Sequence, residues 1–181
     1  MFENGKNLEL CEDPDARWAY CVTNPKTYEF IFEVYQEAID LFKPAYFHIG
    51  HDEFADRGRV PYRESSKKFT VEELLVQDTL KLCEWLRQRG VKPMLWGDMF
   101  LGPGEGPDAC NAKSVESARE LRGKLPKDAL VADWHYAPSK PDAFVSLDRF
   151  HEAGVRTVAS VWYKPENVVH FARAAYVKKS L

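Results

Sequence analysis

The chain has 181 residues and a mass of 20.9 kDa, about the size of one globular domain. Hydrophobic residues make up 45% and charged residues 29%, which are ordinary values for a folded protein and exclude a disordered or collagen-like chain. The formal charge is −3, with Lys and Arg scattered among Asp and Glu, whereas a nucleic-acid partner needs a clustered cationic surface. No window reaches the roughly 18 apolar residues of a membrane span, so we expect neither a nucleic-acid nor a membrane partner.

Helical and strand-like segments alternate along the chain. Apolar residues recur at three- and four-residue spacing over 28–42 and predict an amphipathic helix that begins near Pro25, a residue suited to the first helical position. The apolar run at 45–50 predicts a short buried strand, which ends at the charged tripeptide 51–53. A helix therefore leads directly into a strand.

The same plan then repeats. Thr70 and Glu73 form a capping-box pattern, an apolar stripe follows, and Gly90 marks the helix end. The remaining elements are expected, in chain order, as a strand at 91–96, a weaker helix at 114–121, a strand at 129–134, a helix at 142–153, a strand at 155–162 and a helix at 165–178. Parallel pairing is the natural arrangement, because each crossover helix covers an apolar strand.

Two architectures fit this order, an open doubly wound sheet and a closed (β/α)8 barrel. A doubly wound nucleotide binder needs a Gly-rich turn after its first strand, but neither GxGxxG nor GxxxxGK[ST] occurs in the sequence. A barrel predicts polar and aromatic residues at the carboxyl ends of its strands. Such residues follow all four strands, in HIGHDEF at 48–54, LWGDM at 95–99, DWHY at 133–136 and VWY at 161–163.

The expected fold class is therefore α/β of the (β/α)8 TIM-barrel type, present only in part. A whole barrel needs about 250 residues. The four strand-helix units of this chain amount to about half of one, so we expect a fragment that lacks strands at both ends.

The four cysteines, Cys11, Cys21, Cys83 and Cys110, form no CxxC pair and no Cys/His cluster at zinc-finger spacing. Buried or unreactive thiols are the default expectation in a chain of this size. A single bridge between Cys11 and Cys21 is the alternative.

Tryptophans mark three of the four strand ends. Trp96, Trp134 and Trp162 occupy equivalent places in successive units, so in a barrel they would face one shared mouth. A polar side chain accompanies them at these strand ends: Asp98, His135 and Tyr136. Flat aromatic walls with hydrogen-bonding neighbours are typical of a sugar pocket, whereas the alternative is that the tryptophans only fill a core.

Asp52 and Glu53 form the most informative dipeptide. Adjacent side chains on a strand point to opposite faces, so both can serve one substrate only if the strand has already ended. Ordinary retaining glycosidases place two carboxylates about 5 to 5.5 Å apart across the sugar, whereas a neighbouring pair suits two different roles on one side. A solvated surface pair is the alternative. His48 and His51 also admit a metal site, but strand spacing does not point both the same way, and we expect neither a metal nor a cofactor.

The stretch from Leu10 to Phe54, above all HIGHDE at 48–53, resembles glycoside hydrolase family 20, the β-N-acetylhexosaminidases, whose signature is HxGGDE. The resemblance extends over most of the chain and is weaker after the second strand. It implies a (β/α)8 barrel with the Asp-Glu pair at the end of strand four. The strands of this chain would then be about strands four to seven, and residues 1–181 would form a partial catalytic barrel lacking the first three strands and the last.

The resemblance also implies roles for individual residues. Glu53 would protonate the leaving oxygen as general acid and then activate water as general base. Asp52 would hold and polarise the 2-acetamido group of the substrate, whose oxygen attacks the anomeric carbon and gives an oxazolinium intermediate. The residues expected to contact the sugar are His48, Trp96, Asp98, Trp134, Tyr136, Trp162 and Tyr163.

Tyr163 is the first candidate for the tyrosine that bonds the acetamido oxygen, and Tyr136 is the second. The sequence departs from the family pattern in two places. His51 replaces the usual second glycine of the signature, and no acid follows Tyr163 as in the family's Tyr-x-Asp, which leaves the hydroxyl-binding role to Asp98 or Glu166.

The expected function is a retaining exo-glycosidase that removes terminal β-linked N-acetylglucosamine or N-acetylgalactosamine, with β-linked N-acetylhexosamine glycans or glycoconjugates as its partners. The family's sugar-binding arginine on strand one and tryptophan on strand eight have no counterpart here, which leaves an inactive isolated fragment as one outcome. The main alternative is a decayed barrel that binds amino sugars without cleaving them. A metal-dependent hydrolase that uses His48, His51 and Asp52 is the third.

Overall fold

The computed structural model describes residues 1–55 and 58–180. The chain divides into two compact units, one formed by Met1–Ala45 with Glu53–Thr79 and the other by Tyr46–Asp52 with Leu80–Leu181. The strands all belong to the second unit.

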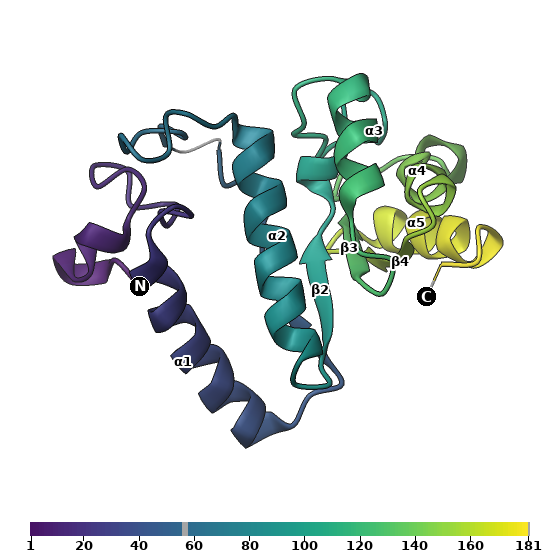
Figure 1. The fold of residues 1–181 in the computed structure, drawn as a ribbon. Coiled ribbons are helices and arrows are strands. Elements are labelled where there is room, and N and C mark those ends of the chain that lie inside the picture. Colours follow the sequence, from purple (N-terminus) through teal and green to yellow (C-terminus); the bar gives the residue numbers. More distant parts are fainter. Residues whose placement is uncertain (56–57, 181) are drawn as a thin grey trace. The chain divides into compact units, whose positions relative to one another are not determined.

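Every helix and strand expected from the sequence is present (Figure 1). The α-helices are α1 (Pro25–Phe42), α2 (Val71–Arg87), α3 (Val115–Lys124), α4 (Ser146–Glu152) and α5 (Pro165–Val177). The strands are β1 (Tyr46–His48), β2 (Lys92–Trp96), β3 (Leu130–Trp134) and β4 (Arg156–Ser160). Short 3-10 turns lie at η1 (Glu3–Gly5), η2 (Leu8–Leu10), η3 (Asp98–Phe100) and η4 (Pro141–Ala143). In the part of the chain that the structure describes, no helix has the length and apolar character needed to cross a bilayer.

Within the described residues, the strands form one sheet in the order β1-β2-β3-β4, with every neighbouring pair parallel. Each connection returns through helical structure, as parallel pairing requires. The carboxyl ends of all four strands therefore lie at the same edge of the sheet, which is where the sequence concentrates its polar and aromatic residues.

The strand register decides which side chains share a face of the sheet. Trp96 pairs with Ala132, and Trp134 pairs with Ser160. Paired residues of a parallel ladder point to the same side, and so do residues two apart on one strand. Trp96 and Trp134 therefore share one face, which we call the tryptophan face. His48 lies on it too, because it pairs with Met94, two residues before Trp96.

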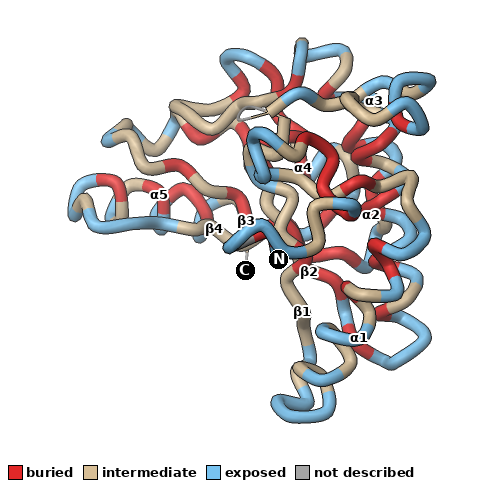
Figure 2. Tube along the Cα trace, turned by 90° about the vertical axis from the view of Figure 1, so that its left-hand side faces the viewer, coloured by how far each residue is buried: buried red, intermediate tan, exposed pale blue. Residues whose placement is uncertain are grey.

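The opposite side of the sheet, which we call the helix face, is packed under helices. Leu95 and Val131 on this side have no exposed surface. A Cβ atom added at Gly97 would lie 2.9 Å from Val131 Cγ1 and 3.0 Å from Phe150 Cζ, so α4 packs directly on the strand ends. Figure 2 shows the buried stretches of β2 and β3 that result.

Helix α4 begins later than expected, at Ser146 instead of residue 142. The chain first makes the η4 turn, and the backbone then leaves the helical region at Phe144, with φ −85° and ψ 61°. This break allows the Phe144 ring to stack on Phe171 of α5, with centroids 4.3 Å apart and planes 11° apart. Leu147, Ala174 and Ala175 complete this buried cluster. Burial of an aromatic pair outweighs continuation of the helix by four residues.

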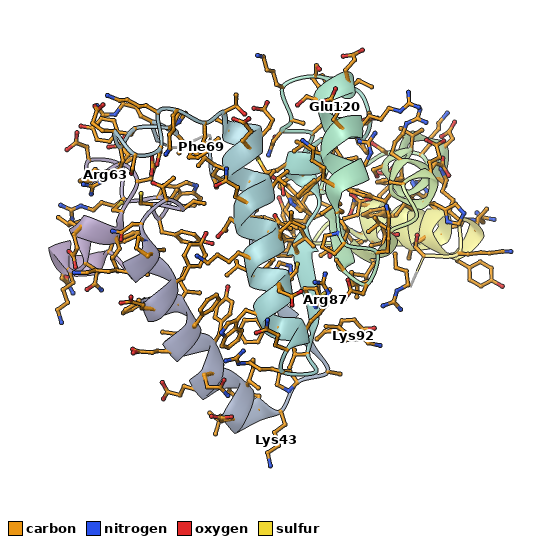
Figure 3. The ribbon with its side chains drawn as sticks, viewed as in Figure 1. Lys43, Arg63, Phe69, Arg87, Lys92 and Glu120 are labelled. Carbon is orange, nitrogen blue, oxygen red and sulfur yellow. The ribbon has the colours of Figure 1, made fainter. Side chains whose placement is uncertain are left out.

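The helix ends follow the sequence signals. Asn24 Oδ1 accepts a hydrogen bond from the Lys26 amide at 3.1 Å and caps α1. At α2 the Glu73 carboxylate accepts from the Thr70 amide at 2.8 Å, and Thr70 Oγ1 accepts from the Glu73 amide at 3.1 Å, which confirms the capping box. Arg87, labelled in Figure 3 at the end of α2, donates to Asp128 at 2.7 and 3.1 Å and so fastens that end to the segment before β3.

In the first unit, acidic side chains near the N-terminus bind the segment after residue 58. Glu12 Oε1 accepts from the Tyr62 and Arg63 amides at 2.7 and 3.0 Å, and Asp13 accepts two bonds from the Arg59 guanidinium at 2.7 and 2.8 Å. The Arg59 guanidinium holds the pKa of the Asp13 carboxyl well below its usual range. These pairs join two segments in which the sequence predicts no regular element.

The cysteines are free thiols, and all four lie within the described residues. The Cys11 thiol donates to the carbonyls of Asp13 and Ala19, and the Cys21 thiol contacts the hydroxyls of Thr23 and Ser66. The default expectation of buried thiols is confirmed for Cys11, Cys21 and Cys83. The alternative of a Cys11–Cys21 bridge is wrong, because both thiols are free and each sulfur makes its polar contacts with other residues.

Candidate functional site

Strand β1 ends at His48, four residues before Asp52. The backbone then turns through left-handed conformations at Gly50 (φ 83°), His51 (φ 78°) and Glu53 (φ 45°). The alternation of a strand therefore no longer governs Asp52 and Glu53, and the condition set by the sequence, that the strand must already have ended at the dipeptide, is met. Asp52 is exposed, and Glu53 is partly buried, with its carbonyl accepting a 2.9 Å bond from Trp18 Nε1.

His48 lies on the tryptophan face as a neutral imidazole. Its Nδ1 accepts a 3.0 Å hydrogen bond from the Gly50 amide, so the ring proton sits on Nε2. Burial lowers the pKa of His48, in agreement with the neutral form. The ring packs against Trp96 with centroids 4.5 Å apart, and its buried Nε2 has no hydrogen-bond partner among the described residues. His48 thus holds one unused donor at the strand end.

Aromatic side chains form a row along the carboxyl ends of β3 and β4. The Trp134 and Tyr136 ring centroids are 4.8 Å apart, Tyr136 lies 5.0 Å from Trp162, and Trp162 lies 5.2 Å from Tyr163. Trp162 and Tyr163 are 60% and 69% exposed. We call Trp134, Tyr136, Trp162 and Tyr163 the aromatic row. It has the flat faces and hydroxyl groups that a sugar ring needs.

The three tryptophans are not register partners of one another in the sheet. Trp134 lies two residues beyond the register partner of Trp96, and Trp162 lies two residues beyond the register partner of Trp134. Steps of two residues keep the same face, so each strand presents its tryptophan further along than the strand before.

Asp98 directs Trp134 from the start of η3. The Asp98 side chain is almost fully buried, and its Oδ1 accepts from Trp134 Nε1 at 3.0 Å while its Oδ2 accepts from Asn111 Nδ2 at 2.9 Å. The structure therefore brings Asp98 and Trp134 together. A direct contact of Asp98 with substrate stays a prediction. Asn111 was not predicted, because nothing in the sequence marks this loop residue.

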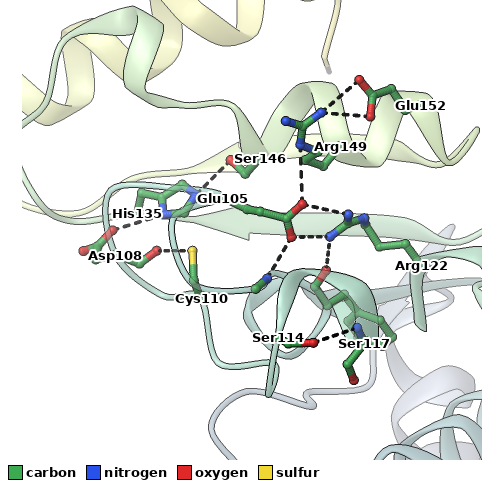
Figure 4. A network of polar contacts seen from close by, with 12 residues as sticks. Glu105, Asp108, Cys110, Ser114, Ser117, Arg122, His135, Ser146, Arg149 and Glu152 are labelled. Carbon is green, nitrogen blue, oxygen red and sulfur yellow. Dashed lines mark hydrogen bonds and ion pairs between the residues drawn. The ribbon is translucent and has the colours of Figure 1, made fainter. Parts of the chain in front are cut away.

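His135 differs from the arrangement expected from the sequence, which grouped it with the tryptophans. It follows Asp133 by two residues, so it lies on the helix face, where its ring is fully buried between Asp133 and Asp108. Figure 4 shows the contacts of the ring with Asp108 and Ser146. Sequence reasoning missed both aspartates and Ser146, which bonds the ring at 2.9 Å. The spacing of two between Asp133 and His135 was the available signal, because residues two apart on a strand point to the same face.

Among residues 1–55 and 58–180, no group of three or more His, Cys, Asp and Glu side chains is arranged to hold a metal ion. His48 is instead bonded to the backbone through Nδ1. The geometry offers the metal-dependent alternative no ligand set in this part of the chain.

Three solved structures are similar to this chain. The chitobiase of Flavobacterium johnsoniae is 28% identical, with a TM-score of 0.52 over 79% of this chain and 20% of that one. A GH20 exo β-N-acetylglucosaminidase of Vibrio harveyi, solved with N-acetylglucosamine, is 21% identical, with a TM-score of 0.54 over 78% and 19%. Dispersin B is 18% identical, with a TM-score of 0.55 over 96% and 48%. No curated protein matches the chain.

This chain spans less than half the length of each of these structures. The likeness confirms the expected fold class, an α/β chain that forms part of a TIM barrel. The family model described as glycosyl hydrolase family 20, catalytic domain, matches residues 5–176, which is nearly the whole chain. With that match, the parallel sheet and the resemblance of HIGHDE to the family signature, the chain belongs to glycosyl hydrolase family 20.

Proposed function

We propose that the protein is a retaining exo-glycosidase that removes terminal β-linked N-acetylglucosamine or N-acetylgalactosamine by substrate-assisted catalysis. The observation that carries this proposal is the position of Asp52 and Glu53 in the chain. Asp52 follows the end of β1 by four residues, Glu53 comes next, and β1 belongs to the same sheet as β2 and β3, which end in Trp96 and Trp134. The proposal concerns the full-length protein, in which further strands would flank β1 and β4.

In this scheme Glu53 donates its proton to the glycosidic oxygen as the bond to the anomeric carbon breaks. The acetamido oxygen of the substrate forms the new bond to that carbon from the opposite face, which gives an oxazolinium ion. Asp52 accepts the acetamido N–H and stabilises the positive charge that develops there. Glu53, now ionised, removes a proton from water as the water oxygen bonds to the anomeric carbon. The bond from that carbon to the acetamido oxygen breaks, which restores the neutral acetamido group and gives overall retention.

The aromatic row supplies the wall of the proposed pocket. Stacking on Trp134 and Trp162 suits the apolar face of a pyranose, and the hydroxyl of Tyr163, or of Tyr136, suits the acetamido oxygen. Asp98 keeps the Trp134 indole in place through its 3.0 Å bond. The unused Nε2 donor of His48 suits a sugar hydroxyl.

The relatives support the substrate class. One of them is named a chitobiase, and another is an exo β-N-acetylglucosaminidase solved with N-acetylglucosamine. Both act on or hold amino sugars with the 2-acetamido group that the proposed mechanism requires.

The test uses the full-length protein and an aryl β-N-acetylglucosaminide. The Glu53→Gln variant should lose activity by about 10²- to 10⁴-fold, the usual contribution of a general acid-base group. The Asp52→Asn variant should lose about 10²- to 10³-fold, the usual cost of removing one group that stabilises developing charge. The matched control is Glu64→Gln, since the Glu64 side chain is 87% exposed and pairs with the surface residue Lys67. A Glu53→Gln variant as fast as the parent would contradict the catalytic assignment.

Participation of the acetamido group is tested separately. The parent should not cleave the corresponding aryl β-glucoside, which lacks that group, and N-acetylglucosamine thiazoline should inhibit it as a mimic of the oxazolinium ion. Equal rates on the two substrates would exclude substrate assistance and leave a two-carboxylate mechanism.

A second candidate, an amino-sugar-binding protein without turnover, is favoured by one observation. His51 holds φ 78° at the place where the family signature has glycine, and so brings a side chain into the segment that carries the Asp-Glu pair. Binding of the thiazoline with no detectable hydrolysis would support this candidate over the enzyme.

A further inference from the structure

Polar groups from three segments surround the ring of His135, and Figure 4 shows two of them, Asp108 and Ser146. Its Nδ1 lies 3.1 Å from Asp108 Oδ1 in the loop between η3 and α3, and its Nε2 lies 2.9 Å from Ser146 Oγ at the start of α4. Ser146 Oγ in turn donates to Asp133 Oδ2 at 2.6 Å, and Asp133 Oδ1 lies 3.3 Å from His135 Nε2. His135 and Asp133 have no exposed surface.

Counting protons shows that His135 carries a positive charge. The Ser146 hydroxyl hydrogen is used on Asp133, so Ser146 Oγ must accept from His135 Nε2–H. An ionised Asp108 carboxylate can only accept, so His135 Nδ1 must also carry a hydrogen. Both ring nitrogens are donors, which is the imidazolium form.

The electrostatics agree with this count. Burial alone disfavours a charged ring, but the interactions with the Asp108 and Asp133 carboxylates outweigh it and raise the pKa of His135 to about 9. Partial burial opposes ionisation of Asp108 too, yet its bonds from His135 and two backbone amides hold the pKa of that carboxyl below its usual range. Burial, followed by Asp133, Glu105 and Asp108, raises the pKa of the nearby Cys110 thiol to about 12, so this group stays neutral. The remaining neighbours described around the ring, Phe144 and Phe171, are apolar.

The charged ring fastens a loop to the end of β3. Asp108 Oδ2 accepts from the Tyr136 and Ala137 amides at 3.0 and 2.9 Å, so one carboxylate holds both the ring and the backbone beyond it. At Gly106 the loop backbone lies directly on the ring, since an added Cβ atom would stand 2.3 Å from His135 Cε1. The loop and the strand end thus form one unit around His135.

His135 stands between the two residues that begin the aromatic row. Trp134 and Tyr136 point to the tryptophan face, and His135 points to the helix face. A side chain bonded at both nitrogens on one side of the backbone fixes the direction of its neighbours on the other side.

We propose that His135 is a positioning residue of the glycosidase, which sets the place of Trp134 and Tyr136 against the sugar through the charged hydrogen bonds that it makes with Asp108 and the Ser146–Asp133 pair on the helix face. This inference rests on the proposed function, because it assumes that the aromatic row contacts the substrate.

The test compares the parent with His135→Asn in the full-length protein. The matched control is His151→Asn, since His151 is an exposed histidine on α4 with no part in this network. On the aryl β-N-acetylglucosaminide, His135→Asn should raise KM about tenfold while kcat changes less than threefold, because the misplaced rings weaken sugar binding and leave the Asp52-Glu53 pair untouched. The His151→Asn variant should match the parent.

A pH profile separates positioning from a merely structural role. KM of the parent should rise as the pH passes through about 9 and His135 loses its proton, and this alkaline limb should be absent from His135→Asn. Asp108→Asn is a second variant in case His135→Asn fails to fold. In Asp108→Asn a neutral side-chain amide replaces the carboxylate beside His135 Nδ1, so the charged ring is less stabilised. The pH at which KM rises should then move down toward the ordinary pKa of histidine. A KM that is independent of pH in the parent, or parent-like KM values in both variants, would overturn the inference.

The dissociation constant of N-acetylglucosamine thiazoline gives a readout that does not need turnover. A parent that binds the thiazoline but cleaves nothing contradicts the proposed function alone. In that case a tenfold weaker Kd in His135→Asn still supports the inference, and an unchanged Kd overturns it.

Discussion

Replacement of Glu105 by glutamine should be among the most destabilising single changes in the second unit. Glu105 and Arg122 form a bidentate ion pair at 2.7 and 2.9 Å, with both side chains about 5% exposed (Figure 4). Glu105 also accepts from the Gly102 amide at 2.8 Å, and Arg149 Nε lies 3.4 Å away. One carboxylate thus pairs with two guanidinium groups and holds the loop after η3.

The magnitude follows from what the change leaves behind. In Glu105→Gln the side chain keeps one oxygen that can accept but turns its NH2 toward a donor. The Arg122 charge then stays buried without a counter-charge, beside the Phe100 carbonyl that lies 2.7 Å from Nη1. Breaking one partner of a buried pair costs about 3–5 kcal/mol. For a chain of this size that corresponds to a fall in Tm of about 6–20 °C. Arg122→Met should cost less, about 2–3 kcal/mol, because Arg149 and the Gly102 amide still neutralise and bond the carboxylate.

The assay is urea unfolding followed by tryptophan fluorescence, with a thermal scan alongside. Glu152→Gln is the control, since the Glu152 side chain is 63% exposed and pairs with the same Arg149; it should change the free energy of unfolding by less than about 0.5 kcal/mol. A double variant, Glu105→Leu with Arg122→Met, should recover much of the loss. A Glu105→Gln variant within 1 kcal/mol of the parent would refute the reasoning, because the buried charge would then not need its partner.

Three further predictions concern stability. Gly106→Ala should lower Tm sharply, because the new Cβ atom would lie 2.3 Å from the His135 ring. Gly123→Ala, on the exposed face of α3 with nothing within 4 Å, should instead stabilise the protein by about 0.5–1 kcal/mol. Equal effects of the two substitutions in a thermal scan would contradict the geometry. Since the pKa of His135 is raised from 6.5 to about 9, its contribution is complete below pH 6.5 and is lost as the pH rises through 9. The free energy of unfolding should thus fall by on the order of 3 kcal/mol between these values in the parent and stay flat in His135→Asn. Thr70→Ala should cost about 1 kcal/mol through loss of the α2 cap, as measured by urea unfolding, and a cost near zero would show that Glu73 alone suffices.

The local signals in the sequence predicted most of the fold. The Asn24-Pro25 start, the Thr70 capping box and the apolar strand runs each depend on neighbours within a few residues, and each corresponds to an observed element. The start of α4 could not be predicted in this way. It depends on Phe144 meeting Phe171, a contact across 27 positions that no local pattern encodes.

The candidate site shows the same division. Trp96 and Trp134 share a face because their spacing and register follow the period of two, which the sequence displays. The sequence named His135 only as a polar neighbour of Trp134 at the strand end, and its place on the helix face follows from its parity with Asp133. Asp108 and Asn111 were invisible for another reason, since they lie in an irregular loop and act on residues more than ten positions away.

The left-handed backbone at Gly50, His51 and Glu53 also governs which substitutions this segment tolerates. At Gly50 an added Cβ atom would meet nothing within 4 Å, so the restriction there lies in the backbone conformation and not in the space available. Asn, Asp and His enter the left-handed region far more readily than β-branched residues do. A library of variants should therefore be depleted of Val, Ile and Thr at positions 50 and 51 on folding grounds alone. A HIGHDE-like segment in a protein of this fold is therefore evidence for the turn, and in the proposed mechanism only Asp52 and Glu53 of this segment take part in hydrolysis.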